Sequence, residues 1–219
     1  MTNPQKSAVV LMSGGMDSTL CAAIALSQGY EVAGLHLNYK QRTEAREEHS
    51  FNDVCDFYKI TKRLTVDVSY FNQIGGSSLT DMDMQVSRAN LDSKEIPTSY
   101  VPFRNANILA ISTSWAEVIG ASAIFIGAMQ LDSSGYPDCR QSFFDAFQNA
   151  IDLGTKPETK IEIITPLMNL SKADIVREGV KLGVPFHLTW SCYQNSDVPC
   201  GVCDSCALRK RGFELAGVE

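Results

Sequence analysis

Residues 13–18, Ser-Gly-Gly-Met-Asp-Ser, have the composition of an anion-binding turn. Two glycines let the backbone adopt conformations closed to other residues and approach a ligand closely. The apolar run before them predicts a buried strand. The helix formers after them predict a helix whose free amide groups and dipole attract phosphate. The segment has neither the spacing of a Walker motif nor that of a dinucleotide fingerprint. We predict a phosphate-binding turn; the alternative is a turn in which glycine serves geometry alone.

Four of the seven cysteines crowd into fifteen residues near the carboxyl end: Cys192, Cys200, Cys203 and Cys206. Four soft thiolates suit tetrahedral zinc and leave no open coordination position, so the predicted zinc site is structural. An iron–sulfur cluster uses similar cysteine runs, and free core cysteines are the remaining alternative. Cys21, Cys55 and Cys139 are predicted not to be ligands.

Short apolar runs alternate with helical patterns along most of the chain. The predicted strands are residues 8–12, 31–37, 63–68, 123–126 and 161–164, and the predicted helices are 19–28, 43–58, 107–119, 143–151 and 171–182. This alternation predicts crossover units on a mostly parallel sheet, hence a doubly wound α/β domain. We place that domain at residues 1–189 and a small metal-stapled subdomain at 190–219, where the alternation ends.

Two stretches interrupt the alternation, residues 69–102 and 129–140. The first is rich in Ser, Asp, Asn and Gly and is longer than a compact connection needs, which predicts an excursion that covers the substrate. Ser171 and Asp174 have capping-box spacing at the start of a helix. Lys172 in the first turn opposes the helix dipole, so it is either a phosphate contact or a plain solubilising residue.

The composition is that of an ordinary globular chain of 219 residues, 44% hydrophobic and 20% charged, with a formal net charge of -6. No apolar run approaches the roughly 20 residues that span a bilayer, and residues 1–6 are too short and polar for a signal peptide. We therefore expect a cytoplasmic protein with no membrane partner. The acidic balance counts against a protein that coats nucleic acid and favours small substrates.

Residues 13–18 resemble the PP-loop of the ATP pyrophosphatases, which cut ATP between its α and β phosphates and transfer AMP to a substrate oxygen. Further segments resemble one family of that superfamily, the 7-cyano-7-deazaguanine synthases of queuosine and archaeosine precursor synthesis. They are Asn-Tyr-Lys-Gln-Arg at 38–42, Tyr-Val-Pro-Phe-Arg-Asn at 100–105, Ser-Gly-Tyr-Pro-Asp-Cys-Arg at 134–140, Thr-Pro-Leu-Met at 165–168 with Lys172, and Cys-Tyr at 192–193 before the other cysteines. These matches span nearly the whole chain in the family's order.

The resemblance implies that 7-carboxy-7-deazaguanine and ammonia are converted to the nitrile in two ATP-dependent steps, with Mg²⁺ and ATP beside the structural zinc. A carboxylate oxygen is a poor leaving group, and adenylation lets it depart as AMP when ammonia attacks. The amide oxygen is then activated in turn and eliminated. Positioning and charge neutralisation supply most of what a protein can add to such transfers.

The resemblance also implies roles for single residues. The predicted catalytic residues are Asp17, Ser18, Lys172 and Arg104. The predicted ATP contacts are Met12, Ser13, Gly14, Gly15, Met16, Asp17, Ser18, Thr19, Gln41 and Arg42. The predicted substrate contacts are Arg104, Asn105, Asp132, Tyr136, Asp138 and Arg140, with Asp138 accepting from guanine-like N–H groups. The alternative for each arginine is a surface ion pair, and for Tyr136 it is packing in a turn.

Three other functions stay open at this point. A diverged relative would join the activated carboxylate to another amine, on a protein or a nucleic acid. A PP-loop enzyme acting on tRNA would need a basic surface, against which the low Lys and Arg content counts. A non-catalytic zinc ribbon would leave the first two-thirds of the chain unexplained. Many α/β enzymes of this kind pair, so a homodimer is the predicted oligomer.

Overall fold

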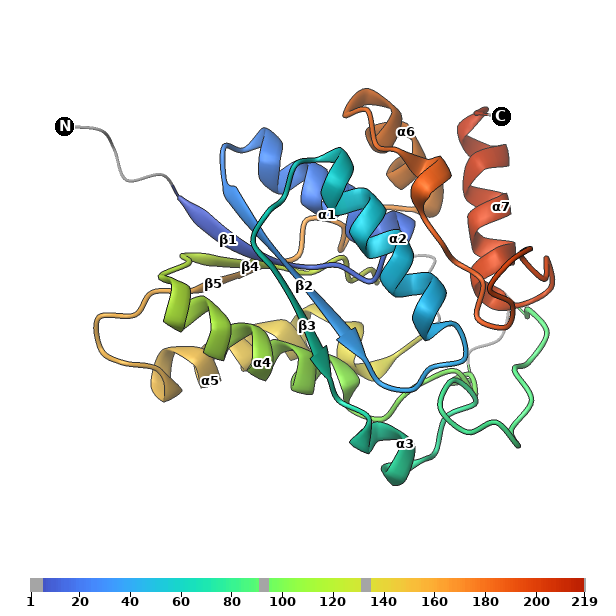
Figure 1. Cartoon of the computed structure of the whole chain (residues 1–219), viewed down its shortest axis with the longest axis horizontal. Helices are drawn as coiled ribbons and strands as arrows, with labels where there is room; N and C mark the ends of the chain where they lie inside the picture. Colours follow the sequence, from blue (N-terminus) through green and yellow to red (C-terminus); the bar gives the residue numbers. More distant parts are fainter. Residues whose placement is uncertain (1–5, 91–94, 131–134, 219) are drawn as a thin grey trace.

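The computed structural model describes residues 6–90, 95–130 and 135–218. Within these residues five parallel strands form one sheet in the order β3-β2-β1-β4-β5 (Figure 1). They are β1 (Ser7–Leu11), β2 (Glu31–Asn38), β3 (Arg63–Asp67), β4 (Ala123–Phe125) and β5 (Glu162–Ile164). The predicted doubly wound α/β class is confirmed, and the predicted strand ends are off by at most one residue.

Helices lie on both faces of the sheet (Figure 1). They are α1 (Met16–Ser27), α2 (Glu44–Phe57), α3 (Tyr70–Ile74), α4 (Arg104–Ile119), α5 (Gln141–Gly154), α6 (Lys172–Lys181) and α7 (Asp204–Ala216). The five helices predicted from the alternation are confirmed. However, α1 and α4 begin three residues earlier than predicted, so that each opens directly on the side chains of the site.

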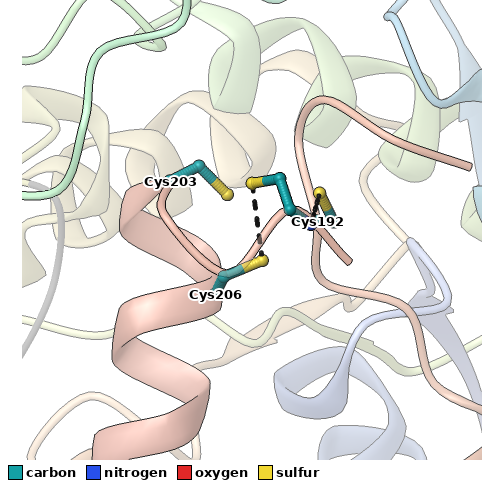
Figure 2. Close-up of side chains that lie close together, drawn as sticks. Cys192, Cys203 and Cys206 are labelled. Carbon is teal, nitrogen blue, oxygen red and sulfur yellow. Dashed lines mark hydrogen bonds between the residues drawn. The ribbon is translucent and has the colours of Figure 1, made fainter. Parts of the chain in front are cut away.

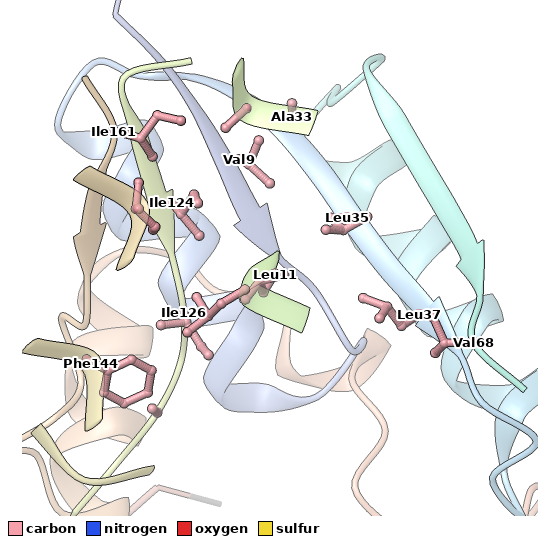
Figure 3. Close-up of a cluster of buried hydrophobic side chains, with 14 of the residues drawn as sticks. Val9, Leu11, Ala33, Leu35, Leu37, Val68, Ile124, Ile126, Phe144 and Ile161 are labelled. Atoms are coloured by element: carbon pink, nitrogen blue, oxygen red, sulfur yellow. The ribbon is translucent and has the colours of Figure 1, made fainter. Parts of the chain in front are cut away.

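Successive side chains of β1 alternate between two hydrophobic cores, one on each face of the sheet. Val9 and Leu11 pack on the face that α4 and α5 cover, whereas Ala8 and Val10 pack on the face that α1 and α2 cover. Figure 3 shows the first of these clusters, with Val9 and Leu11 beside Ile124 of β4. Because successive side chains of a strand point to opposite faces, a strand covered on both sides must be apolar throughout. The valine and leucine side chains each contribute about 1.5–3 kcal/mol when they are fully buried.

The direction in which the chain adds strands to the sheet reverses between β1 and β4. The chain runs from β1 outward to β2 and β3, then returns to β4 on the other side of β1. A doubly wound sheet binds its ligands in the crevice beyond the carboxyl ends of the strands at such a point. A Cβ atom on Gly127, just after β4, would lie 3.1 Å from the Asp17 carbonyl carbon. Glycine therefore lets the end of β4 approach the first turn of α1.

None of the described residues in the stretch 69–102 lines the central pocket described below. After α3 the stretch turns back and packs on the cysteine segment, where the Ala89 N–H donates to the Val202 carbonyl at 2.9 Å. The Arg42 guanidinium holds it by donating to the carbonyl oxygens of Ser78 and Asp81, both at 2.8 Å. The stretch therefore supports the site from outside the pocket.

The predicted capping box at the start of α6 is confirmed. The Asp174 N–H donates to Ser171 Oγ at 3.2 Å, and the Ser171 N–H donates to Asp174 Oδ2 at 3.1 Å. Helix α7 packs closely on α6, since a Cβ atom on Gly212 would lie 3.1 Å from the Cβ of Lys172. None of the helices in the described ranges is long and apolar enough to cross a membrane.

Candidate active site

A pocket of about 290 Å³ opens at the carboxyl ends of β1 and β4. Its wall is built from the turn after β1, the first turn of α4, the start of α6 and the segment that leads into α7. Ten of the predicted site residues line it: Met12, Ser13, Gly15, Met16, Asp17, Ser18, Arg104, Asn105, Tyr136 and Lys172. The fold thus gathers residues from four separate parts of the sequence at one place.

The turn at residues 13–18, here called the glycine turn, depends on Gly14. This residue has a φ of 78°, and a Cβ atom on it would lie 2.7 Å from the Glu47 carbonyl oxygen of α2. The turn is therefore pressed against α2 in a conformation that only glycine adopts freely. The hydroxyl groups of Ser18 and Thr19 both donate to the Gly15 carbonyl, at 3.0 and 2.8 Å. These bonds fix the first turn of α1, whose free amides are the anion-binding element.

Asp17 and Lys172 form an ion pair on the pocket wall. Lys172 Nζ lies 2.6 Å from Asp17 Oδ2, and Lys172 is buried. Among the described residues, Asp17 Oδ1 is buried and has no hydrogen-bond partner. A lysine in the first turn of a helix is disfavoured by the helix dipole, and the Asp17 carboxylate offsets this electrostatic cost for Lys172.

Another part of the pocket wall is aromatic and holds Arg104. Its Nη1 donates to the Tyr39 hydroxyl at 3.0 Å, and Tyr136 and Tyr193 also line the pocket. Burial raises the pKa of Tyr39 to about 12, so its hydroxyl keeps its proton. Among the described residues no carboxylate forms an ion pair with Arg104, which leaves its planar fork available to an anionic ligand.

Glu47 of α2 is a carboxylate on the wall of this pocket that the sequence analysis did not select. Burial raises its pKa, while hydrogen bonds from Thr43 and Gln41 act in the opposite direction. The Thr43 hydroxyl donates to Oε1 at 2.6 Å, and Gln41 Nε2 donates to Oε2 at 3.2 Å. Each carboxylate oxygen keeps a second lone pair for a ligand donor.

The four predicted cysteine ligands come together at the start of α7. Figure 2 labels three of them, Cys192, Cys203 and Cys206. Their Sγ atoms all lie within 4.8 Å of one another. Cys192 Sγ accepts N–H groups of Gln194, Asn195 and Cys200 at 3.3–3.4 Å. Burial opposes ionisation of Cys200, but backbone hydrogen bonds lower the pKa of its thiol to about 7. The cluster can hold a metal ion, since ligating cysteines must be thiolates and a cation removes the repulsion between them.

Trp190 joins this cluster to the glycine turn. Its backbone N–H donates to the Gly14 carbonyl at 2.9 Å, and its indole N–H donates to the Cys192 carbonyl at 3.1 Å. The Arg46 guanidinium lies 4.6 Å from the centre of its ring. These two hydrogen bonds connect the cysteine cluster to the glycine turn.

Several predicted site residues lie away from the pocket wall. Gly14 and Thr19 are buried beneath it, and Gln41 Oε1 accepts the Tyr39 N–H at 2.9 Å. Arg42 is engaged by the carbonyl oxygens of residues 78–84. Arg140 is exposed, and Asp132 lies outside the described residues.

Asp138 caps α4 instead of lining the pocket. Its Oδ2 accepts the Asn105 N–H at 2.9 Å, and its carbonyl accepts Asn105 Nδ2 at the same distance. Burial raises the pKa of the Asp138 carboxyl, although the Asn105 hydrogen bond opposes this shift. Phe103, at the N-cap position of α4, makes no side-chain cap of its own.

The pocket residues that the sequence did not single out include Tyr39, Glu47, Tyr193 and Arg209. Tyr39 and Tyr193 fall inside the segments that carried the family resemblance, which was a usable signal. Glu47 sits in a charged helical pattern and Arg209 in a short basic run, both of which are typical of solvated surface. Only the packing of α2 and α7 brings these two to the pocket.

Comparison with known proteins gives consistent results. The family model described as queuosine biosynthesis protein QueC matches residues 7–217. A protein of Chloroherpeton thalassium named 7-cyano-7-deazaguanine synthase is 61% identical over 211 residues, which cover 96% of this chain and 93% of the relative. The protein of the same name from Chlorobium chlorochromatii is 58% identical over 212 residues, covering 97% and 93%.

Solved structures resemble the fold at low sequence identity. NMN synthetase from Francisella tularensis has a TM-score of 0.53 at 14% identity and covers 99% of this chain and 79% of that chain. A 4-thiouridine synthetase in an RNA complex with bound ATP has a TM-score of 0.53 at 17% identity, with coverages of 97% and 50%. At these identities the likeness shows the fold alone.

Proposed function

The chain belongs to the queuosine biosynthesis protein QueC family, and we therefore propose that it converts 7-carboxy-7-deazaguanine to 7-cyano-7-deazaguanine with ammonia and ATP. It is an enzyme of queuosine precursor biosynthesis. One observation carries the mechanistic proposal: a single pocket joins the glycine turn, the Asp17–Lys172 pair and the Arg104 fork. That arrangement offers one place for a polyphosphate and another for a carboxylate.

The proposed chemistry uses two ATP molecules. A substrate carboxylate oxygen attacks the α-phosphorus of the first, the bond to the β-phosphate breaks and pyrophosphate leaves. Ammonia attacks the acyl carbon, loses a proton and expels AMP, which yields the amide. The amide oxygen attacks the second ATP in the same way, and AMP then departs as the nitrogen loses its protons to form the nitrile. Alignment of the reacting oxygen with phosphorus is the main contribution of the protein.

We assign the protein groups as follows. The amides of the glycine turn bind the phosphates, and Lys172 neutralises the charge that develops when pyrophosphate leaves. Arg104 orients the substrate carboxylate, and the tyrosines around it cover the flat base and exclude water. Glu47 takes the role of acceptor for guanine-like N–H groups, since it lines the pocket and Asp138 does not.

Two metal ions belong to the proposal. Mg²⁺ would neutralise the phosphates when it is bound, and Asp17 fits it because its Oδ1 is buried without a hydrogen-bond partner in the described part of the chain. Zinc would bind the four cysteines. A Zn–S bond of about 2.3 Å puts tetrahedral sulfur atoms roughly 3.8 Å apart, and the observed limit of 4.8 Å suits one ion better than a wider iron–sulfur cluster.

The proposal also extends to the whole protein. We divide it into a nucleotide-binding domain at residues 1–189 and a zinc subdomain at 190–219, and we place a homodimer in the cytoplasm. Ammonia is the proposed nitrogen source, because the nitrile needs no other substituent on nitrogen.

The test is product analysis by mass spectrometry after incubation with the carboxy-deazaguanine, ATP and ammonium. We expect the nitrile and two AMP molecules for each nitrile formed. Asp17→Asn should abolish AMP release without unfolding the protein, whereas Asp152→Asn, at an exposed position on α5, should not affect it. AMP release by the wild-type protein without nitrile would refute the proposed product.

A further inference from the structure

Arg209 is a second arginine on the pocket wall, and like Arg104 it is half-buried. It lies on α7 and lines the pocket together with Asp17 and Ser191. Burial lowers its pKa, while the nearby Asp17 carboxylate acts in the opposite direction. Arg209 therefore lies near Asp17 of the glycine turn, whereas Arg104 lies among the tyrosines.

The partners of Arg209 are neutral. Nη1 donates to Thr189 Oγ1 at 2.7 Å and to Ser191 Oγ at 3.2 Å, and Nη2 donates to the Phe186 carbonyl at 2.8 Å. Within the described residues no carboxylate forms an ion pair with it, and none of these bonds engages Nε. A guanidinium partly withdrawn from water carries a desolvation cost that a nearby anion would offset. Since neutral acceptors need no charged donor, these bonds alone do not account for an arginine here.

The hydrogen bonds do account for the orientation of the guanidinium group. They attach its Nη atoms to residues 186–191, and the Phe213 ring lies 5.4 Å from its Cζ. The start of α7 carries Cys203 at the N-cap position and Cys206 one turn before Arg209. Figure 2 shows both cysteines at that end of the helix. The same short segment thus holds the metal site and places a cation beside the glycine turn.

We propose that Arg209 binds the β- and γ-phosphates of ATP, and the pyrophosphate that leaves, as the contact that the cysteine segment supplies to the nucleotide site. This inference rests on the proposed use of ATP. The polyphosphate is favoured over the substrate carboxylate as the ligand of Arg209, because Arg209 lies near Asp17 and Ser191, while Arg104 lies among the tyrosines. A planar guanidinium fork suits phosphate oxygens.

The experiment measures the binding of ATP, pyrophosphate and AMP by titration calorimetry to the full-length, metal-loaded protein. The variants are Arg209→Gln and Arg209→Lys, and Arg211→Gln is the matched control at an exposed position on the same helix. Metal content and thermal unfolding are recorded for each. We expect Arg209→Gln to weaken ATP and pyrophosphate about 10- to 100-fold, as the loss of a charged hydrogen bond predicts. AMP binding should stay unchanged, and Arg209→Lys should fall between the two.

Two results would overturn the inference while leaving the proposed function intact. One is unchanged binding of ATP and pyrophosphate to Arg209→Gln; the other is equal weakening of all three ligands, which would mean that Arg209 only holds the segment in place. If Arg209→Gln does not fold, the same comparison is made on Arg209→Lys, which keeps the charge. A wild-type protein that binds no ATP would instead refute the proposed function and this inference with it.

Discussion

Replacement of Asp138 separates two roles for that residue, a helix cap and a substrate contact. Asp138→Ala removes the acceptor of the Asn105 N–H in the first turn of α4, where both residues are buried. Loss of a cap costs about 0.5–2 kcal/mol, and an unsatisfied buried N–H adds to this, so we expect a loss near the upper end, about 2 kcal/mol. For a chain of this size that is a fall in melting temperature of roughly 4–8 °C.

Asp138→Asn should behave differently, because its amide oxygen can still accept the Asn105 N–H. Burial raises the pKa of the Asp138 carboxyl in the folded protein. A group with a raised pKa contributes its stability below the pKa of the unfolded chain and loses it as the pH rises through the folded value. The stability of Asp138→Asn relative to wild type should therefore increase with pH across that interval.

The assay is thermal unfolding as a function of pH, together with substrate affinity. Glu47→Gln is the comparison for affinity, since Glu47 lines the pocket and Asp138 does not. We expect Asp138→Asn to bind the carboxy-deazaguanine like wild type and Glu47→Gln to bind it about tenfold less tightly. Asp145→Ala, at an exposed carboxylate on α5, is the control for stability. A large loss of substrate affinity in Asp138→Asn at unchanged stability would refute the cap and restore the substrate contact.

Three further predictions concern the elements that hold the site. Gly14→Ala should lose at least about 3 kcal/mol, because its Cβ would meet α2 backbone at 2.7 Å, whereas Gly29→Ala, with a similar φ of 81° and open space around it, should lose about 1 kcal/mol in chemical denaturation. Ser171→Ala should cost about 1 kcal/mol of unfolding free energy at neutral pH. Hydrogen bonds from Ser171 lower the pKa of Asp174, so the stability that this interaction gives the wild-type protein is present above the unfolded pKa and is lost as the pH falls through the folded pKa. The deficit of the variant should therefore shrink in acid, and a pH-independent deficit would contradict this. Cys203→Ala should lower metal content and melting temperature together, as chelation of the wild-type protein should; full stability after complete metal loss would argue against a structural ion.

The sequence predicts the elements of this fold well because their signals are local. Apolar runs such as residues 8–12 are continuous where a strand is covered on both faces, and the capping box at Ser171 is complete within four residues. The start of α4 is different. Its cap comes from Asp138, which is more than thirty positions later in the chain, so no local pattern places the helix start at Arg104.

The same distinction applies to the site. The glycine turn and the cysteine cluster depend on residues close in sequence, and both converge in space as their spacing predicts. The sequence predicts a ligand contact for both Arg42 and Arg104 on the same grounds. In the structure, loop carbonyl oxygens accept hydrogen bonds from Arg42, whereas Arg104 lines the pocket. Whether a charged side chain faces solvent, a neighbouring loop or a ligand depends on contacts between distant segments, which composition and periodicity do not record.

The charges of the pocket suit the two anionic ligands that we propose, although the protein as a whole is acidic. The chain as a whole carries a formal charge of -6, but Lys172, Arg104 and Arg209 face a common cavity that contains the carboxylates of Asp17 and Glu47. Asp17 neutralises Lys172, and the raised pKa of Glu47 reduces the charge it sets against the arginines. Among the described residues, no carboxylate forms an ion pair with either guanidinium group. Since interactions in a desolvated pocket are screened much less than at the surface, both cations favour the anionic ligands that we propose, despite the net charge of the chain. The sequence ratio of acidic to basic residues therefore describes the surface of this protein and not its site.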